Sequence, residues 1–365
     1  MKILFLGAFD NSEIVLAPLK VANKLFAEFE KSETIEIKYF TYFYDESRRQ
    51  KFFGKEKIKH NIFRFGLIPL LTNILKFKPD IIQIVNPDAF YLPLYFLQPF
   101  IASKIIYHSH SLLQLMLKYY LDDITKYERV RFNLISYFVY KKSDYILLFT
   151  EKEKRYLRRY LGIDERKIFK VNNGVENIDL KKNYFNEDPR VRLIFVGGVN
   201  KKEKGFDYLI STLTKLNRKI ILSIAGYRNK EAYPAMTKNI EINRLDSMNE
   251  KDLRQEFINN DLIIVPSKYD SFNLALLEAM NSGLLFVSTN RVGLTIRMKN
   301  NYDELMVPYG RPDEFARKIE NILNYSKDKK QRLSKEIHEF SLNFIWEKTA
   351  KDYLNIYKKI LAINE

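Results

Sequence analysis

Short apolar runs bounded by turn-forming residues alternate along the chain with longer stretches whose apolar positions recur at helical spacing. This alternation is typical of βαβ units, in which helices connect the strands of a parallel sheet. A long helix is expected from about Leu112 to Lys141. The strands expected in the first half are Ile3–Leu6, Ile35–Tyr39, Ile81–Ile84, Lys104–Tyr107, Tyr145–Phe149 and Lys167–Val171.

The same alternation starts again after the polar segment Glu176–Arg190, which is the best candidate for a linker. A tail from Asn343 to Leu361 carries apolar and aromatic residues at helical spacing and predicts a terminal amphipathic helix. The strands expected in this second series are Arg192–Val196, Ile220–Ile224, Ile240–Asn243, Leu262–Val265 and Leu285–Val287.

The pattern therefore predicts an α/β protein with two doubly wound, Rossmann-like domains. We place the first domain at residues 1–180, the second at 181–342, and a separate C-terminal helix at 343–365. A length of 365 residues agrees with two domains of ordinary size. Ligands of this architecture bind at the carboxyl ends of the strands, so we expect a cleft there, between the two domains.

The composition and charge of the chain exclude several kinds of site and favour an anionic partner. The chain has no cysteine, which excludes disulfides, thiolate metal sites and a cysteine nucleophile, and which fits a reducing cytosol. The apolar start is too short for a signal peptide, and the most apolar stretch, Tyr91 to Tyr107, is interrupted by polar residues and prolines, so no transmembrane helix is expected. A net charge of +16 favours a polyanionic partner: nucleic acid, an anionic membrane surface or a phosphorylated substrate.

The segment from Asp261 to Gly283 is the strongest candidate for a binding site. A buried strand is expected to end at Ser267, and a helix to begin near Ser271. The first amides of a helix have no partner within it, so they form an anion site where they face a ligand. The residues whose amides are expected to do this are Phe272, Asn273 and Leu274.

Two acids belong to the same segment. Asp270 stands just before the helix, and Glu278 lies about two turns along it among apolar neighbours. One interpretation is structural: Asp270 or Ser271 caps the helix, and Glu278 is a solvated surface acid. The other is functional, because a carboxylate with apolar neighbours needs a polar partner, and ribose hydroxyls would serve.

A second candidate is the glycine-rich loop that follows the strand Arg192–Val196. Its glycines would let the backbone approach a phosphate, and Lys204 would supply a positive charge. Gly198 belongs to the same loop. Lys201 and Lys202 are either additional phosphate ligands or simply solvated lysines.

The first half offers a pair of histidines, His108 and His110, directly after the strand that ends at Tyr107. A histidine at the carboxyl end of a strand can donate to a sugar hydroxyl or to developing charge. The alternative is a metal site, but no carboxylate stands at a suitable spacing, so we expect no metal.

These segments together resemble the donor site of retaining GT-B glycosyltransferases of family 4 (group 1), of the type that acts in bacterial polysaccharide biosynthesis. The resemblance implies that Asp270 contacts the donor sugar and Glu278 the ribose. The diphosphate would be bound by Lys204 and by the amides of residues 272–274. The sequence departs from the family at Asp270, where the family usually has Glu, and at Gly198, where it usually has Arg.

The resemblance extends to both ends of the chain. His108 and, in reserve, His110 match a histidine loop of the family, and the His-Ser-His version occurs in exopolysaccharide transferases. Gly7 and Ala8 occupy the place of the family's first glycine-rich loop, next to the acceptor. The terminal helix resembles the final helix of the family, which crosses back to the first domain.

The implied function is transfer of a hexosyl-type sugar, with retained anomeric configuration, from a nucleotide diphosphate sugar to a glycan or lipid-linked acceptor in cell-surface polysaccharide synthesis. The nucleotide sugar is a co-substrate, and no other cofactor is expected. The chain has no Asp-x-Asp motif, so Lys204 and the helix amides are expected to neutralise the leaving group instead of a metal ion. His108 and Asp270 are the expected catalytic residues, and Ser267 and Gly198 complete the donor site.

The remaining expectations concern location and partners. Residues 48–65 interleave cations with aromatic and apolar residues, as a surface segment on an anionic membrane would, although a mobile basic loop is the alternative. We expect a cytoplasmic protein, with a peripheral position on the inner face of the membrane left open. No nucleic-acid-binding motif accompanies the basic charge, so no nucleic acid is expected as a partner. Two other functions stay open: a degenerate, non-catalytic GT-B binding protein, and a basic nucleic-acid-binding protein.

Overall fold

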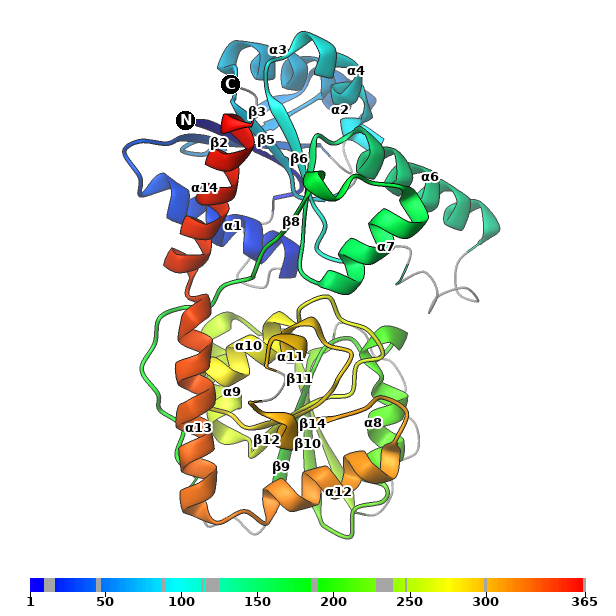
Figure 1. Ribbon diagram of the computed structural model, residues 1–365, viewed down its shortest axis with the longest axis vertical. Helices are drawn as coiled ribbons and strands as arrows, with labels where there is room; N and C mark the ends of the chain where they lie inside the picture. The colour runs from blue at the N-terminus through cyan, green and yellow to red at the C-terminus, as the bar shows by residue number, and fades with distance from the viewer. Residues whose placement is uncertain are drawn as a thin grey trace. The chain divides into compact units, whose positions relative to one another are not determined.

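The computed structural model describes residues 1–9, 17–43, 47–86, 89–112, 115, 125–184, 190–227, 239–246, 248–298 and 301–363. The chain divides into two compact units, shown in Figure 1. The first unit contains Met1–Asn173 and Trp346–Glu365, and the second contains Gly174–Ile345. The chain thus leaves the first unit once and returns to it with its last helix, at positions a few residues from the boundaries 180 and 342 expected above.

An eight-stranded sheet forms the centre of the first unit, in the order β3-β4-β2-β1-β5-β6-β7-β8. Neighbouring strands are parallel except for the hairpin of β3 and β4. The strands are β1 (Lys2–Leu6), β2 (Glu36–Tyr42), β3 (Lys55–Lys59), β4 (Ile62–Phe65), β5 (Ile81–Ile84), β6 (Lys104–His108), β7 (Tyr145–Leu148) and β8 (Ile168–Lys170).

Both faces of this sheet are buried, which explains why its central strands are mostly apolar. Leu4 and Leu6 of β1 belong to a core that also includes residues of α3, α4, α6 and α7. Phe5 points to the opposite face, where its ring contacts Phe26 and Phe29 of α1. The helices are α1 (Ala17–Glu30), α2 (Arg48–Phe53), α3 (Leu67–Phe77), α4 (Leu92–Leu97), α6 (Lys126–Lys142), α7 (Glu151–Leu161) and α14 (Trp346–Ala362).

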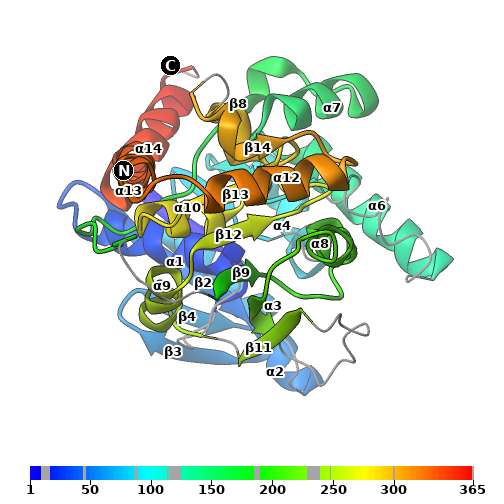
Figure 2. The same ribbon diagram turned by 90° about the horizontal axis from the view of Figure 1, so that it is seen from below.

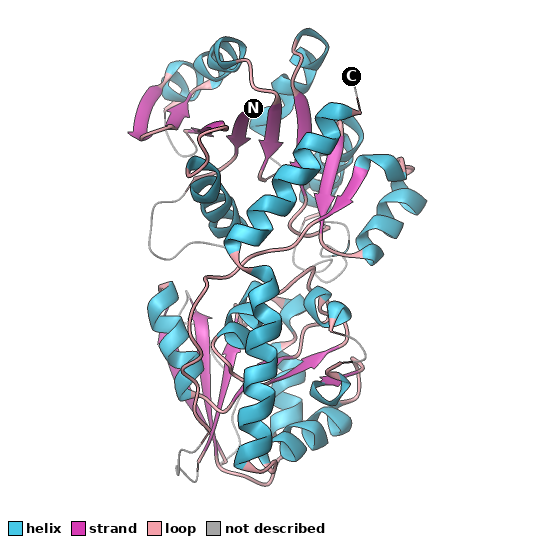
Figure 3. Cartoon of the chain, turned by 60° about the vertical axis from the view of Figure 1, so that its left-hand side comes forward, coloured by secondary structure: helices cyan, strands magenta, loops and turns pink. Residues whose placement is uncertain are grey.

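The second unit is built on a six-stranded parallel sheet in the order β11-β10-β9-β12-β13-β14. Helices cover both faces: α8 packs with α12, while α10 packs with α9 and α13 (Figures 2 and 3). The strands are β9 (Val191–Val196), β10 (Ile220–Tyr227), β11 (Ile240–Asp246), β12 (Leu262–Val265), β13 (Phe286–Thr289) and β14 (Met306–Val307). The helices are α8 (Phe206–Leu213), α9 (Glu250–Asn259), α10 (Leu274–Asn281), α11 (Gly293–Arg297), α12 (Pro312–Leu323) and α13 (Lys327–Ser341).

The predicted fold class, two Rossmann-like α/β domains, is confirmed by these two sheets. The expected strands at 81–84 and 262–265 have the observed bounds, and the others differ by up to three residues at either end. The pattern missed β14 and the hairpin of β3 and β4. Of the helix expected from Leu112 to Lys141, the structure describes α6, and residues 113–114 and 116–124 lie outside the described residues.

The segment at 48–65 begins with a surface helix, α2, as expected, but continues as the edge hairpin of β3 and β4, which was not expected. A capping box at Ser47 explains why a six-residue helix forms there. Ile62 and Phe65 are buried in the core, whereas Phe52 and Phe53 are 49% and 62% exposed. No helix in the described part of the chain is long and apolar enough to cross a membrane.

Candidate active site

The lysine-containing loop of the second unit follows β9 and lies against the end of β12. A short 3-10 turn, η4 (Lys202–Lys204), leads to Gly205, whose left-handed backbone (φ 74°) opens α8. The carbonyl oxygen of Glu203 accepts a hydrogen bond from the Lys268 amide at 2.7 Å. This bond joins the loop to the segment that carries Asp270.

Lys204 and Asp270 form an ion pair. The Nζ atom of Lys204 donates to Oδ2 of Asp270 at 2.6 Å, and the two side chains are 28% and 11% exposed. Burial on its own would lower the pKa of Lys204, but the charge and the hydrogen bond of Asp270 outweigh it and raise that pKa. Lys204 therefore carries its positive charge at neutral pH. The sequence predicted each of these two residues as part of the site but did not predict that they pair.

Asp270 has two further hydrogen-bond donors. The backbone amide of Phe272 donates to Oδ1 at 3.1 Å, and Nδ2 of Asn273 donates to Oδ2 at 3.0 Å. The backbone of Asp270 is also fixed, because its carbonyl oxygen accepts from the Gly293 amide at 2.9 Å. Its carboxylate is thus held in one orientation by three donors from two loops.

The helix after Asp270 begins at Leu274 rather than near Ser271, and its N-cap is Asn273 instead of Asp270 or Ser271. The expectation of three free amides is wrong for Phe272, since its amide donates to Asp270. Across the residues that the structure describes, the backbone amides of Asn273 and Leu274 make no hydrogen bond. These two amides therefore have the property that an anion site at a helix start requires.

The other predicted donor-site residues lie near this helix start. Glu278 is half-buried on α10, between neighbours that are fully buried, so the fully solvated alternative does not hold. Ser267 is buried, and its carbonyl oxygen accepts from the Thr289 hydroxyl at 2.6 Å, so its backbone serves the sheet. Gly198 starts the turn that the Lys201 amide closes at 3.1 Å.

The rings of the two histidines of the first unit are in contact, with centroids 3.9 Å apart and planes tilted by 39°. His108 is only 1% exposed, and its Nε2 lies 3.2 Å from the hydroxyl of Tyr353 on α14. Burial and the neighbouring His110 lower the pKa of His108, and burial lowers that of His110 to about 3. Both rings are therefore neutral at physiological pH. His110 is partly exposed whereas His108 is buried, so His110 lies nearer the surface; its Nε2 atom is itself buried and has no hydrogen-bond partner among the described residues.

The first loop of the chain, with Gly7 and Ala8, is held by Asn86 and Tyr39. The Ala8 amide donates to Oδ1 of Asn86 at 2.8 Å, and the Tyr39 hydroxyl donates to the Ala8 carbonyl at 2.7 Å. A Cβ atom on Gly7 would lie 2.8 Å from both Asn86 and Val85, so only glycine fits this close approach.

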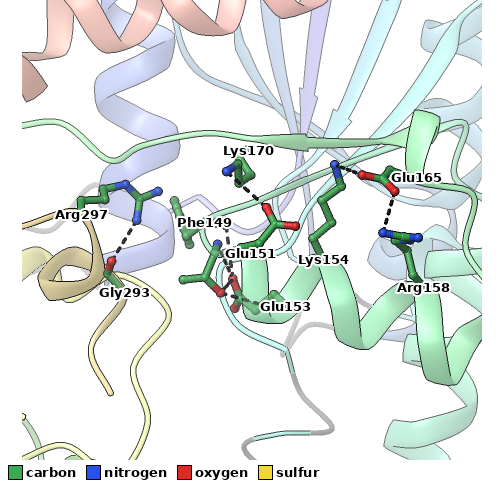
Figure 4. A network of polar contacts seen from close by, with 10 residues as sticks. Phe149, Glu151, Glu153, Lys154, Arg158, Glu165, Lys170, Gly293 and Arg297 are labelled. Carbon is green, nitrogen blue, oxygen red and sulfur yellow. Dashed lines mark hydrogen bonds and ion pairs between the residues drawn. The ribbon is translucent and has the colours of Figure 1, made fainter. Parts of the chain in front are cut away.

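The histidine pair packs on Phe149, which directly follows β7 and precedes a capped helix. Glu153 of α7 is fully buried, and its carboxylate accepts from the amide and the hydroxyl of Thr150 at 2.9 Å each (Figure 4). Lys154 and Arg158 of α7 both pair with Glu165, which follows the helix. The turn that supports the histidines is thus a rigid one.

Two residues that fix these groups were not predicted as site residues, Tyr353 and Glu153. Asn273 was predicted only for its backbone amide, and not for the side chain that caps α10 and donates to Asp270. A polar residue directly before an apolar helix is a preferred N-cap, so the capping role of Asn273 could have been found from its position. The threonine and glutamate at 150 and 153 have the spacing of a capping box. Tyr353 could not have been found from the sequence, because it is 245 residues away from His108, which it contacts. Among the described residues, no group of three or more His, Cys, Asp or Glu side chains could hold a metal ion.

Comparison with known proteins identifies the family. Residues 30–177 match the sequence model described as Glycosyltransferase Family 4, and residues 190–325 match the one described as Glycosyl transferases group 1. An uncharacterized glycosyltransferase of Methanocaldococcus jannaschii is 24% identical over 229 residues, which cover 60% of this chain and 57% of that protein, less than two thirds of its length. An uncharacterized 41.2 kDa protein in the cps region of Klebsiella pneumoniae is 25% identical over 270 residues, 70% of this chain and 71% of that protein.

Solved structures agree with this assignment. Sucrose-phosphate synthase from Thermosynechococcus elongatus has a TM-score of 0.74 at 14% identity, with both chains fully covered. Anabaena HepE in complex with UDP-glucose has a TM-score of 0.68 at 12% identity, with 97% of this chain and 99% of that chain covered. These likenesses show that the fold is GT-B. The chain belongs to the family 4, or group 1, glycosyltransferases.

Proposed function

We propose that the protein is a retaining, metal-independent glycosyltransferase that moves a hexosyl-type sugar from a nucleotide diphosphate sugar to a glycan or lipid-linked acceptor. The observation that carries the proposal is the arrangement at the carboxyl ends of β9 and β12. There a charged lysine, a fixed carboxylate and two backbone amides that have no partner among the described residues lie on adjoining segments. This set can bind a diphosphate and a sugar hydroxyl without a metal ion.

Each residue has a proposed role. Lys204 and the amides of Asn273 and Leu274 bind the diphosphate, Glu278 accepts hydrogen bonds from the ribose, and Asp270 accepts one from the donor sugar. In the reaction, the bond between the anomeric carbon and the phosphate oxygen breaks, and the acceptor oxygen bonds to the same face of that carbon. The acceptor proton passes to the departing phosphate oxygen. Lys204 stabilises the negative charge on that oxygen.

On the acceptor side we assign to His110 the role that the sequence suggested for His108. His108 is buried against Tyr353, whereas His110 is partly exposed. Because its pKa is about 3, His110 would act as a neutral hydrogen-bond partner of a sugar hydroxyl and not as an acid. Gly7 and Ala8, with their fixed turn, would contribute backbone groups to the acceptor.

Two comparisons support the chemical class of the substrates. Anabaena HepE, which shares the fold, has been solved with UDP-glucose. A relative of 25% identity is named for the cps region of Klebsiella pneumoniae, which supports a role in cell-surface polysaccharide synthesis.

Thermal stabilisation by a panel of nucleotide sugars tests donor binding, since a ligand that binds only the native state raises its stability. With the donor so found, we expect slow hydrolysis without acceptor, reduced at least about tenfold in Lys204→Ala and Glu278→Ala. Lys215→Ala, which removes a surface lysine paired with Asp313, is the control and should hydrolyse normally. A folded protein that neither binds nor hydrolyses any donor would support the non-catalytic alternative and overturn the proposal.

We also propose that the protein binds anionic membranes as a peripheral protein on the cytoplasmic face, through α2 and β3. Phe52 and Phe53 are exposed beside the cations of these two elements. Sedimentation with phosphatidylglycerol vesicles should fall in Phe52→Ser/Phe53→Ser but not in Phe96→Ser/Phe100→Ser, which removes two other exposed rings. Equal loss in both variants, or salt-sensitive binding to DNA or RNA in place of vesicles, would contradict this surface.

A further inference from the structure

Asn273 uses both ends of its side chain. Its Oδ1 accepts from the Leu276 amide at 2.8 Å and caps α10, while its Nδ2 donates to Oδ2 of Asp270 at 3.0 Å. The residue is 8% exposed and has a left-handed backbone, with φ 71° and ψ 84°. Asparagine tolerates this conformation better than most residues with a side chain. Its amide group therefore has a fixed orientation relative to Asp270.

The acceptor positions of Asp270 are nearly all used. A carboxylate offers about four lone-pair positions, two on each oxygen. Oδ2 accepts from Lys204 and Asn273, and Oδ1 accepts from the Phe272 amide. Counting the donors in the described part of the chain, one position on Oδ1 is left for a ligand.

Lys204 has two competing partners in the proposed function. The structure pairs its ammonium with Asp270, yet a bound diphosphate carries more negative charge and would attract the same ammonium. If Lys204 turned to the diphosphate, Asp270 would lose its shortest hydrogen bond at the moment when the sugar arrives. The donors that would still hold it are the Phe272 amide and Asn273.

We propose that Asn273 is the positioning residue of Asp270: it holds the carboxylate in place while Lys204 binds the donor diphosphate, so that the open acceptor position of Oδ1 meets a hydroxyl of the donor sugar. The inference rests on the proposed function and adds a positioning residue to it. The release of Lys204 also opens one position on Oδ2, so Asn273 and the Phe272 amide, with one donor on each oxygen, determine which two positions face the sugar.

Asn273→Asp separates the two tasks of the side chain. It keeps an oxygen to cap α10, removes the donor to Asp270 and sets a second carboxylate beside it. Asn273→Gly removes both functions but suits the left-handed backbone. Asn249→Asp is the matched control, since Asn249 caps α9 through the Asp252 amide in the same way and lies outside the site.

We expect kcat/KM for donor hydrolysis to fall roughly ten- to hundredfold in Asn273→Asp, because a hydrogen bond to a charged group is lost. Affinity for the nucleoside diphosphate alone, measured with UDP, ADP and GDP, should fall clearly less than kcat/KM in the same variant, since the cap and Lys204 remain and the new carboxylate acts on the diphosphate only through its charge. The acid limb of its pH profile should move to higher pH. Asn249→Asp should match the wild type in all three measurements.

A second measurement does not depend on the donor. In a crystal structure of Lys204→Met, Asp270 should keep its hydrogen bond to Asn273, and in Lys204→Met/Asn273→Gly its side chain should leave its present orientation. An Asp270 that moves in the single variant would overturn the inference. So would an Asn273→Asp enzyme with normal kcat/KM, or one whose losses for the donor and for the nucleoside diphosphate are equal. A wild type that binds no nucleotide sugar would overturn the proposed function, while the crystal structures would still test the positioning role.

Discussion

At the scale of single residues, Gly205 determines how closely the lysine loop can approach β12. A Cβ atom on this glycine would lie 2.3 Å from the carbonyl oxygen of Pro266, and its φ of 74° lies in the left-handed region. Both the close approach and the conformation require glycine. The distance between Lys204 and Asp270 is therefore set by a residue that contacts no ligand.

Gly205→Ala should lower the free energy of unfolding by roughly 2–4 kcal/mol, from left-handed strain together with the clash against a backbone atom. Gly310→Ala is the matched control, because Gly310 has a φ of 93° with no atom within 4 Å of its Cβ position. Gly310→Ala should lower the free energy of unfolding only through left-handed strain, by roughly 1–2 kcal/mol. Urea denaturation of both variants measures the difference, and equal losses would mean that the loop moves aside without cost.

At the scale of elements, the strands were predictable because each is a short apolar run within a buried sheet. The hairpin of β3 and β4 was not predictable, because β3 is an exposed edge strand with four charged residues out of five. The start of α10 was placed three residues early, because the sequence suggested Asp270 or Ser271 as the cap and the structure uses Asn273.

The candidate site was predictable to the same extent. Lys204, Asp270 and Glu278 could be singled out because strand ends and helix starts place such residues at one edge of a sheet, and because their segments resemble the family's donor site. The ion pair between Lys204 and Asp270 was not predictable, because these residues are 66 positions apart and their contact depends on how closely the two loops pack. The preference for His108 failed to foresee its burial, since the residue that covers it, Tyr353, comes from the far end of the chain.

The segment after the first unit is attached to α9 by a buried lysine. Lys182 donates through Nζ to the carbonyl oxygens of Ile258 and Asn260 at 2.7 and 2.5 Å. These carbonyls belong to the C-terminal end of the helix, where a positive charge is favourable. Burial nevertheless lowers the pKa of Lys182 from 10.5 to about 8.

This pKa predicts how stability depends on pH. Between pH 8 and 10.5 the unfolded state keeps a proton on Lys182 that the folded state has lost, so stability rises with pH in that range. Subtracting the free energy of unfolding of Lys182→Met from that of the wild type isolates the effect, which is best measured from pH 7 to 9.5, below the ionisation of unfolded tyrosines. The free energy of unfolding of the wild type minus that of Lys182→Met should increase as the pH rises. A difference that does not change with pH would contradict a lowered pKa of Lys182.

At the scale of the whole molecule, α14 returns the end of the chain to the first unit. Tyr357 is fully buried, its ring contacts Phe29 of α1 at a centroid distance of 6.0 Å, and its hydroxyl donates to Gln83 of β5. Tyr353 reaches His108 in the next strand. The last residues of the chain thus complete one face of a sheet whose first strand begins at Lys2, so the first unit cannot be fully folded before the second has been synthesised.

The same contacts predict which strands become less stable when a residue of α14 is substituted. Tyr357→Ala should cost roughly 3–5 kcal/mol, because it leaves a cavity against α1 and removes the partner of a buried amide side chain. Hydrogen exchange should then speed up at the amides of β1 and β5 while those of β9 and β12, in the second unit, keep their protection. Tyr160→Ala, at a position that is 67% exposed in the same unit, should change neither set. If β9 and β12 lost protection together with β1 and β5, the two units would unfold as one cooperative body, and α14 would stabilise the whole chain instead of the unit to which it belongs.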